Sequence, residues 1–202
     1  MADVEKINYQ KLLDELLVNL QGKPSLLLHS CCGPCSSYVI EYLSNYFDIT
    51  VYYYNPNIHP REEYLRRLET QKKLVQRLGG AILIEGDYLP ERFFDAVKGS
   101  ENEPEGGERC RLCIDERLDS TARMAALGNF NFFATTLTVS PHKNAQSINN
   151  SGFELEKKYG VRWLPSNFKK KEGYKRSIEL SAQFELYRQD YCGCVFSLKN
   201  SN

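Results

Sequence analysis

The sequence has no excess of charge of either sign, because 26 lysines and arginines balance 26 aspartates and glutamates among 202 residues. A balanced chain has no general attraction to nucleic acid or to an anionic surface, so any RNA-binding face must be a local basic patch. The sequence also lacks a hydrophobic run long enough to cross a bilayer, and residues 1–10 are polar and charged without an apolar core. We therefore expect a soluble, cytoplasmic protein that has no membrane partner.

Internal repeats and low-complexity linkers are also missing from the sequence. A chain of 202 residues can bury a substantial core but is short for two full domains. We expect residues 1–202 to form a single domain.

Cysteine is the residue type that stands out. Each of the seven cysteines lies within three positions of another: Cys31, Cys32 and Cys35; Cys110 and Cys113; Cys192 and Cys194. In a chain expected to be cytoplasmic, closely spaced cysteines are more typical of metal or redox sites than of a disulfide framework, and their odd number indicates the same. Four thiolates can complete a zinc site or an iron–sulfur cluster. A structural zinc would leave three cysteines idle, whereas seven could serve a cluster plus a second metal or a redox pair, which favours iron–sulfur over zinc.

Strand and helix patterns alternate along the chain. Short apolar or β-branched runs bounded by turn residues predict strands at 25–30, 49–54, 81–84, 130–136 and 161–164. Helical periodicity predicts helices at 7–20, 34–43, 64–78, 90–97 and 109–127, another that reaches 159, and a C-terminal helical segment at 177–188. This alternation predicts an α/β fold with a Rossmann-like parallel sheet of about five strands and helices on both faces.

Chemistry-bearing residues follow three of the predicted strands. The cysteine turn 31–35 follows the first strand, residues 55–59 follow the second, and the loop 136–144 follows the fourth. Sites in such folds form at the carboxyl ends of strands, so these segments should converge on one crevice. Pro34 suits the first turn of a helix, whose N-terminal amides favour thiolate over thiol.

Two polar segments have simpler interpretations. Residues 99–108 contain no apolar side chain and are predicted to form a mobile acidic loop or lid. Arg66, Arg67, Lys72 and Lys73 lie off the apolar side of the helix at 64–78, where we expect a solvated face.

Six motifs are distributed from about residue 26 to residue 197. They are Cys31-Cys32-Gly33-Pro34-Cys35, Asn55-Pro56-Asn57-Ile58-His59-Pro60, Glu108-Arg109-Cys110-Arg111-Leu112-Cys113, Ser140-Pro141-His142-Lys143-Asn144, Phe168-Lys169-Lys170, and Tyr187-Arg188-Gln189-Asp190-Tyr191-Cys192-Gly193-Cys194. Together they resemble the cobalamin-independent epoxyqueuosine reductases.

This resemblance implies the last step of queuosine formation in tRNA. The epoxide on the cyclopentane ring of epoxyqueuosine is removed to leave an alkene, which consumes two electrons and releases water. The implied partners are a tRNA anticodon loop that carries epoxyqueuosine and an unidentified low-potential electron donor. The family is similar in fold to the nucleotide α-hydrolase group, but residues 31–35 replace its Ser-Gly-Gly-x-Asp-Ser phosphate loop. We therefore expect neither ATP nor cobalamin.

The resemblance also implies roles for the cysteines. Cys31, Cys32, Cys110 and Cys113 are expected to bind a [4Fe-4S] cluster. Cys192 and Cys194 are expected to form a redox-active pair that can close to a disulfide bond, or to bind an adjacent mononuclear iron. Cys35 is expected to act in catalysis or to complete such a second metal site. A second redox centre could store the second electron, and a second metal could bind the epoxide oxygen as a Lewis acid.

The departing oxygen must be protonated, so an acid is required near it. Asp190, Tyr191, His29 and His59 are candidates, although Asp190 also suits a cap or salt bridge and His29 suits a satisfied core histidine. Asn55, Asn57 and His59 are predicted to contact the substrate.

The densest basic patch consists of Lys169, Lys170, Lys171, Lys175 and Arg176, next to the aromatic residues Phe168 and Tyr174. Phosphate contacts from such a patch, together with stacking on aromatic rings, suit a single-stranded anticodon loop. We predict that Lys169, Lys170, Lys171 and Arg188 bind the tRNA, with a solvated loop as the alternative.

Two other functions are compatible with the motifs. Cys-Cys-Gly turns also occur in iron–sulfur disulfide or heterodisulfide reductases. A zinc-stabilised RNA-binding module would use the same cysteines without any chemistry.

Overall fold

The computed structural model describes residues 7–198. The elements follow one another as α1 (Tyr9–Val18), β1 (Ser25–His29), α2 (Gly33–Leu43), β2 (Asp48–Tyr53), α3 (Arg61–Leu78), β3 (Ala81–Glu85), α4 (Pro90–Val97), α5 (Glu108–Leu127), β4 (Phe132–Thr135), the 3-10 turn η1 (Thr136–Val139), α6 (Ala145–Tyr159), β5 (Arg162–Trp163), α7 (Gly173–Gln183) and α8 (Val195–Leu198).

The five strands form one parallel sheet in the order β3-β2-β1-β4-β5, which confirms the predicted fold class. The chain leaves β1 toward β2 on one side and later returns to β4 on the other side. His29, the last residue of β1, therefore lies in register between Tyr52 of β2 and Thr135 of β4. Such a change of direction opens a crevice beyond the carboxyl ends of the two central strands.

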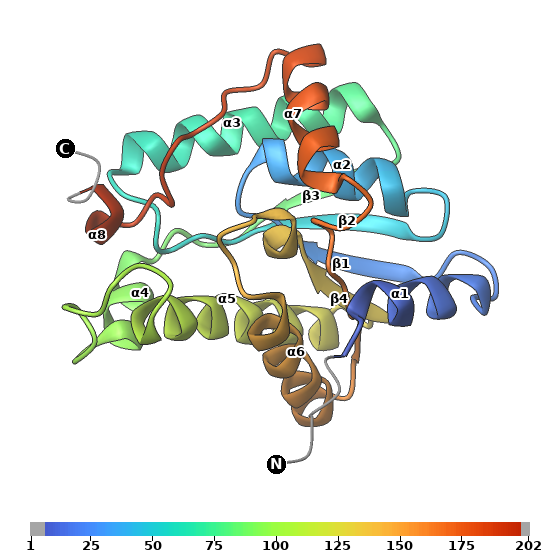
Figure 1. Ribbon diagram of the computed structural model, residues 1–202, viewed down its shortest axis with the longest axis horizontal. Helices are drawn as coiled ribbons and strands as arrows, with labels where there is room; N and C mark the ends of the chain where they lie inside the picture. Colours follow the sequence, from blue (N-terminus) through green and yellow to red (C-terminus); the bar gives the residue numbers. More distant parts are fainter. Residues whose placement is uncertain (1–6, 199–202) are drawn as a thin grey trace.

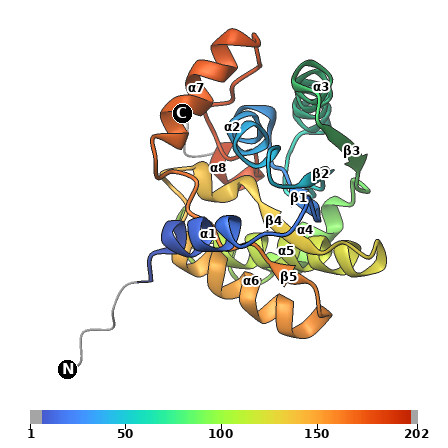
Figure 2. The same cartoon turned by 90° about the vertical axis from the view of Figure 1, so that its right-hand side faces the viewer.

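Helices cover both faces of the sheet, as predicted (Figure 1). The helices α2, α3 and α7 lie on one face, and α4, α5 and α6 lie on the other, an arrangement that the turned view also shows (Figure 2). Leu13 and Leu17 of α1 belong to the same core cluster as the buried side chains of α2. Burial on both faces explains the continuous apolar run of β1, because Leu26 and Leu28 pack toward α2 while Leu27 packs toward α5.

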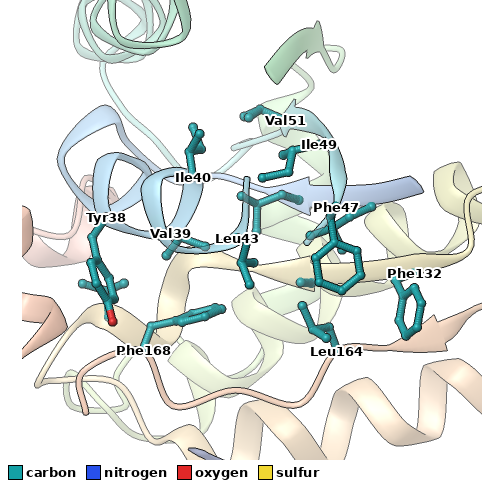
Figure 3. Close-up of a cluster of buried hydrophobic side chains, with 14 of the residues drawn as sticks. Tyr38, Val39, Ile40, Leu43, Phe47, Ile49, Val51, Phe132, Leu164 and Phe168 are labelled. Carbon is teal, nitrogen blue, oxygen red and sulfur yellow. The ribbon is translucent and has the colours of Figure 1, made fainter. Parts of the chain in front are cut away.

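The larger part of the core lies between α2 and the sheet (Figure 3). Ile40 and Leu43 of α2 lie on the side of Ile49 and Val51 of β2, and Val39 belongs to the same buried cluster. All five are at most 3% exposed. This packing holds the start of α2, and with it the cysteine turn, against the end of β1.

The last long helix differs from its predicted position. It spans Gly173–Gln183 rather than 177–188, because the chain turns at Phe184 and Glu185 adopts a positive φ of 50°. We call residues 184–194 the C-terminal strap. The strap leaves α7 and passes along α3 to α8 (Figure 1). Helical spacing alone could not predict this path, since it depends on contacts with a helix more than 100 residues away in the chain.

Within residues 7–198, the structure contains no helix that is both long enough and apolar enough to span a membrane. The polar segment 1–10 lies mostly outside the described residues. The acidic segment is a loop over residues 99–107, as predicted, and its last predicted residue, Glu108, begins α5. The Arg109 guanidinium donates to the carbonyl oxygens of Glu101 and Glu103 in this loop.

Candidate metal and substrate site

A cavity of about 750 Å³ lies at the carboxyl ends of the central strands. Its wall includes Cys31 after β1, Asn55 and Asn57 after β2, and Lys143 after β4. The three loops that follow these strands therefore converge, as the sequence predicts. The C-terminal strap closes one side with Arg188, Gln189, Asp190, Tyr191 and Cys192.

The first cysteine group lies at the start of α2. The sulfur atoms of Cys31, Cys32 and Cys35 lie within 4.8 Å of one another and could together hold a metal ion. Contacts with the Cys31 and Cys35 thiols hold the pKa of Cys32 well below its usual range. Contact with Cys32 raises the pKa of Cys31, and contacts with Cys31 and then Cys32 raise the pKa of Cys35. The negative charge of the group is thus held on Cys32, the N-cap residue of α2.

Buried polar contacts fix this turn against α3. The Ser30 hydroxyl donates to Oε1 of Gln71 over 2.7 Å, and the Ser36 hydroxyl lies 2.9 Å from the same oxygen. Gly33 permits the close approach, because a Cβ atom at this position would lie 2.9 Å from Cγ2 of Thr70. The cysteine turn is therefore held by residues of α3 as well as by its own helix.

The second cysteine group lies around a small adjoining space. Cys110 and Cys113 lie one turn apart at the start of α5 and line this space together with Cys192 and Cys194 of the strap. The amide of Gly106 donates to the Cys110 sulfur over 3.3 Å, and burial raises the pKa of Cys113 to about 11. All seven cysteines are free thiols.

The four cysteines predicted to bind the cluster are divided between these groups. Cys31 and Cys32 belong to the first, and Cys110 and Cys113 belong to the second. The two groups share neighbours, since the charges of Cys31 and Cys113 both act on Arg117, and Cys192 interacts with both Cys31 and Cys113. A soft, all-sulfur donor set of this kind suits an iron–sulfur centre or zinc.

Arg67 holds the strap to α3, and its predicted place on a solvated face is wrong. The residue is 2% exposed, and its guanidinium pairs with Glu63 over 2.6 Å. It also donates to the carbonyl oxygens of Cys192, over 3.0 Å, and Tyr191, over 3.4 Å. The helix pattern could not predict this burial, because the strap that covers Arg67 comes from the other end of the chain.

Two further cations face the thiols. Nζ of Lys143 lies 3.6 Å from the Cys192 sulfur, and Arg117 is 3% exposed and lines both the cavity and the adjoining space. Contact with Cys194, followed by the charges of Lys143 and Arg117, holds the pKa of Cys192 well below its usual range. Contact with Cys192 raises the pKa of Cys194.

The candidate acids occupy different places. His29 is fully buried, and burial lowers its pKa to about 3, so the ring is neutral at pH 7. Its Nδ1 lies 2.8 Å from the Thr135 hydroxyl and its Nε2 lies 3.1 Å from the Tyr54 carbonyl oxygen, which confirms a satisfied core histidine. Asp190 and Tyr191 line the cavity.

His59 packs against the rings of Tyr88, Phe93 and Phe94, and it is absent from the residues that line the cavity. Its backbone amide donates to the Gly193 carbonyl oxygen over 2.8 Å. His59 therefore helps to hold the Cys192-Gly193-Cys194 segment.

Amide side chains form the cavity wall near the end of β2. Asn55 and Asn57 are 1% and 2% exposed, and Nδ2 of Asn55 donates to the Ser30 carbonyl oxygen over 2.8 Å. Among residues 7–198, the Oδ1 atoms of Asn55 and Asn57 and the Oε1 atom of Gln189 are buried and have no hydrogen-bond partner. A bound ligand or water could donate to these oxygens.

The basic patch is largely paired within the protein. Lys171 forms a salt bridge with Asp14 over 2.7 Å, and Arg176 forms one with Glu41 over 2.7 Å. Nζ of Lys169 donates to the Lys143 carbonyl oxygen over 2.7 Å. None of Lys169, Lys170 and Lys171 lines the cavity, whereas Arg188 does, with its guanidinium over the Tyr174 ring at 5.4 Å.

Four residues of the site were not predicted as site residues: Arg67, Arg117, Lys143 and Gln189. Lys143 could have been predicted from the sequence, because it lies in the loop after the fourth strand, where sites of this fold form. Gln189 could also have been predicted, because it lies three positions from Cys192. The burial of Arg67 and Arg117 depends on helix packing and has no local signal.

Comparisons with known proteins show which chains this one resembles. The family model described as epoxyqueuosine reductase QueH matches residues 26–200. The chain is 46% identical to the epoxyqueuosine reductase QueH of Staphylococcus aureus, over 96% of this chain and 85% of the relative. It is 45% identical to the one from Streptococcus pyogenes, over 96% and 80%, and 38% identical to the one from Thermotoga maritima, over 86% and 90%.

Proposed function

This chain belongs to the epoxyqueuosine reductase QueH family, and from that membership we infer that it reduces epoxyqueuosine in tRNA to queuosine. The enzyme is an oxidoreductase. Removal of the epoxide oxygen takes two electrons and two protons, and yields the alkene and one water. Because the modified base lies in an anticodon loop, it must leave the loop and enter the cavity to react.

We propose that Cys31, Cys32, Cys110 and Cys113 hold a [4Fe-4S] cluster. Six of the seven free thiols line the cavity or the small space beside it, and the seventh, Cys32, lies beside Cys31 and Cys35. This gathering of thiols carries the proposal, because no purely structural zinc site would use them all. When bound, the cluster supplies single electrons at low potential. The Gly106 amide that donates to the Cys110 sulfur and the helix start at Cys32 both favour thiolate ligands.

We propose that Cys192 and Cys194 deliver the reducing equivalents to the substrate side of the site. Two thiols that close to one disulfide release two electrons and two protons, which equals the demand of one epoxide. The lowered pKa of Cys192 and the raised pKa of Cys194 leave one thiolate and one thiol in the pair. The alternative is that both cysteines, with Cys35, bind a mononuclear iron beside the cluster.

The remaining side chains bind and orient the substrate. We propose that Asn55 and Asn57 contact the modified base at the cavity wall, and that Arg188 contacts the tRNA at the cavity mouth. Asp190 lies at the same mouth and is the carboxyl group placed to deliver a proton to the departing oxygen. The electron donor is expected to be a low-potential protein or small molecule of the cytoplasm.

The test is anaerobic purification followed by iron, sulfide and zinc analysis and by reduction of epoxyqueuosine in tRNA. We expect about four iron atoms per chain for the cluster, with a further one if Cys35, Cys192 and Cys194 bind a mononuclear iron. Cys110→Ala and Cys113→Ala should lose the cluster, whereas Cys192→Ala and Cys194→Ala should retain it and lose turnover. A colourless protein that contains zinc and binds tRNA without reducing the epoxide would favour the RNA-binding module. Reduction of a disulfide substrate in place of the epoxide would favour a disulfide reductase.

A further inference from the structure

Arg117 is a buried cation between the two cysteine groups. Its side chain is 3% exposed and lines both the cavity beside Cys31 and the small space beside Cys113. Nε donates to the Cys113 carbonyl oxygen over 3.1 Å, which fixes the guanidinium one turn after that cysteine on α5. The planar group therefore has a fixed position relative to both sets of sulfur atoms.

No salt bridge joins Arg117 to a carboxylate anywhere in residues 7–198. The charges that act on it are, in order, those of Cys113, Cys192 and Cys31, followed by Glu116. Arg67 provides the contrast, because that buried guanidinium is paired with Glu63 over 2.6 Å. An arginine cannot lose its proton inside a protein, so the charge of Arg117 has to be balanced by something else.

Lys143 repeats this arrangement on the loop after β4. Its Nζ contacts the Cys192 sulfur at 3.6 Å and faces the thiols of Cys192 and Cys110, with Glu105 acting at longer range. Its only hydrogen bond from the side chain within the part of the chain that the structure describes is the one to Cys192. The site thus holds two cations that lack a carboxylate partner.

A buried, unpaired charge costs several kcal/mol, so an enzyme retains one only where a counter-charge is present in the working state. The Cys192 thiolate that contacts Lys143 supplies one such charge, which leaves one of the two cations unbalanced in the metal-free protein. An iron–sulfur cluster with four thiolate ligands carries a net negative charge of about two, and reduction by one electron makes it more negative. The two positive charges of Arg117 and Lys143 match this charge, and they stabilise the reduced form more than the oxidised form.

We propose that Arg117, together with Lys143, is the built-in counter-charge of an anionic metal–thiolate centre and raises the reduction potential of that centre. This role rests on the proposed function, since it requires the cysteines to hold such a centre. Arg117 is a positioning and electrostatic residue: it orients no substrate and transfers no proton. Its charge makes the centre easier to reduce by the low-potential donor.

The experiment compares Arg117→Gln and Arg117→Lys with the unmodified enzyme after anaerobic reconstitution with iron and sulfide. The reduced fraction is measured by electron paramagnetic resonance in a titration with dithionite and mediators. At the potential that half-reduces the unmodified enzyme, we expect less than one tenth of the Arg117→Gln centre to be reduced, and nearly half of the Arg117→Lys centre. Arg123→Gln removes an exposed arginine from the same helix and should leave the titration unchanged.

Thermal unfolding of the metal-free and loaded proteins supplies a second readout. Loss of an unbalanced buried charge should leave metal-free Arg117→Gln at least as stable as the metal-free unmodified protein. The increase in melting temperature on loading should be smaller in the variant. If Arg117→Gln does not fold, Lys143→Gln provides the second test. This variant removes the other cation, which lies on a loop, and should also lower the reduction potential of the centre.

Each outcome has a distinct meaning. An unmodified enzyme that takes up no iron overturns both the proposed cofactor and this inference. A cluster that forms in every protein and titrates identically in Arg117→Gln, Lys143→Gln and the unmodified enzyme overturns this inference alone. A lowered potential in Arg117→Gln that Arg117→Lys restores supports it.

Discussion

The guanidinium of Arg67 donates to the Cys192 carbonyl oxygen over 3.0 Å, and this bond joins the middle of α3 to the C-terminal strap. Gly193 makes the contact possible, because its φ is 107° and a Cβ atom there would lie 2.8 Å from the Arg67 guanidinium. Tyr187, at the other end of the strap, donates to both carboxylate oxygens of Glu63 over 3.1 Å. One ion pair on α3 therefore holds the segment that brings Cys192 to the cavity.

Replacement of Arg67 by alanine should weaken both the fold and the strap. Glu63 would keep its buried charge without its cationic partner, which costs about 3–5 kcal/mol of unfolding free energy. Cys192 should also become more reactive toward a thiol reagent in the metal-free protein. Urea unfolding and the rate of thiol labelling measure the two effects. Arg66→Ala is the matched control, since Arg66 is exposed and its guanidinium lies over the Tyr187 ring; an equal loss in both variants would contradict the role of Arg67.

Replacement of Gly33 by alanine should displace the cysteine turn from α3. The new methyl group would lie 2.9 Å from Cγ2 of Thr70 and 3.3 Å from its carbonyl oxygen, and such overpacking costs about 1–3 kcal/mol. Both the free energy of unfolding and the uptake of iron should therefore fall. Thr70→Ser removes Cγ2 and keeps the hydroxyl that donates to the Arg66 carbonyl oxygen, so Gly33→Ala with Thr70→Ser should recover part of the loss. A double variant no more stable than Gly33→Ala would show that this contact does not limit the packing.

Acid should destabilise the fold through His29. Burial lowers the pKa of His29 to about 3, below its value of about 6.5 in an unfolded chain, so only the unfolded state binds the proton between these limits. The contribution of neutral His29 to the free energy of unfolding is complete above about pH 6.5. It is lost as the pH falls, at about 1.4 kcal/mol per pH unit. Urea unfolding of the metal-free protein at pH 5 and pH 7 measures the slope. His29→Gln should reduce it, and His142→Gln, a change at an exposed histidine, should not; equal slopes in all three proteins would refute the prediction.

Lysines of the basic patch should differ in their effect on tRNA binding. Lys171 is already paired with Asp14, whereas Lys170 is exposed and enters no salt bridge with the residues that the structure describes. The logarithm of the binding constant falls linearly with the logarithm of the salt concentration, and each lost phosphate contact to a single strand reduces the steepness of this slope by about 0.7. Lys170→Ala and Arg188→Ala should therefore weaken binding and flatten the dependence, and Lys171→Ala should change neither. Filter binding across a salt series is the measurement, and a large effect of Lys171→Ala would place the tRNA elsewhere on this surface.

Much of the fold was predictable because its signals are local. The apolar run 25–30 and the turn residues after it predict a buried strand that ends at cysteines, and β1 spans Ser25–His29. The convergence of the loops after β1, β2 and β4 was predictable from a general rule of parallel sheets. The satisfied core position of His29 also followed from its place at the end of a buried strand.

The partition of the seven cysteines and the identity of their neighbours were not predictable in the same way. Spacing along the chain pairs Cys110 with Cys113 and Cys192 with Cys194, but it does not place these two pairs around one space. Arg67 and Arg117 have polar side chains on helices, where the local pattern favours solvent. Each is buried because a segment distant in sequence covers it.

The sequence by itself determined the class of chemistry: thiols at helix starts, a parallel α/β sheet, and a site at the ends of its strands. Only the tertiary structure decided which charges face those thiols. The reason is physical, because helix and strand periodicity depends on the nearest turns of the chain, whereas the contacts of Arg67 with Cys192 and of Lys143 with the strap span 125 and 49 residues. Such contacts are set by how the helices and loops pack on the sheet.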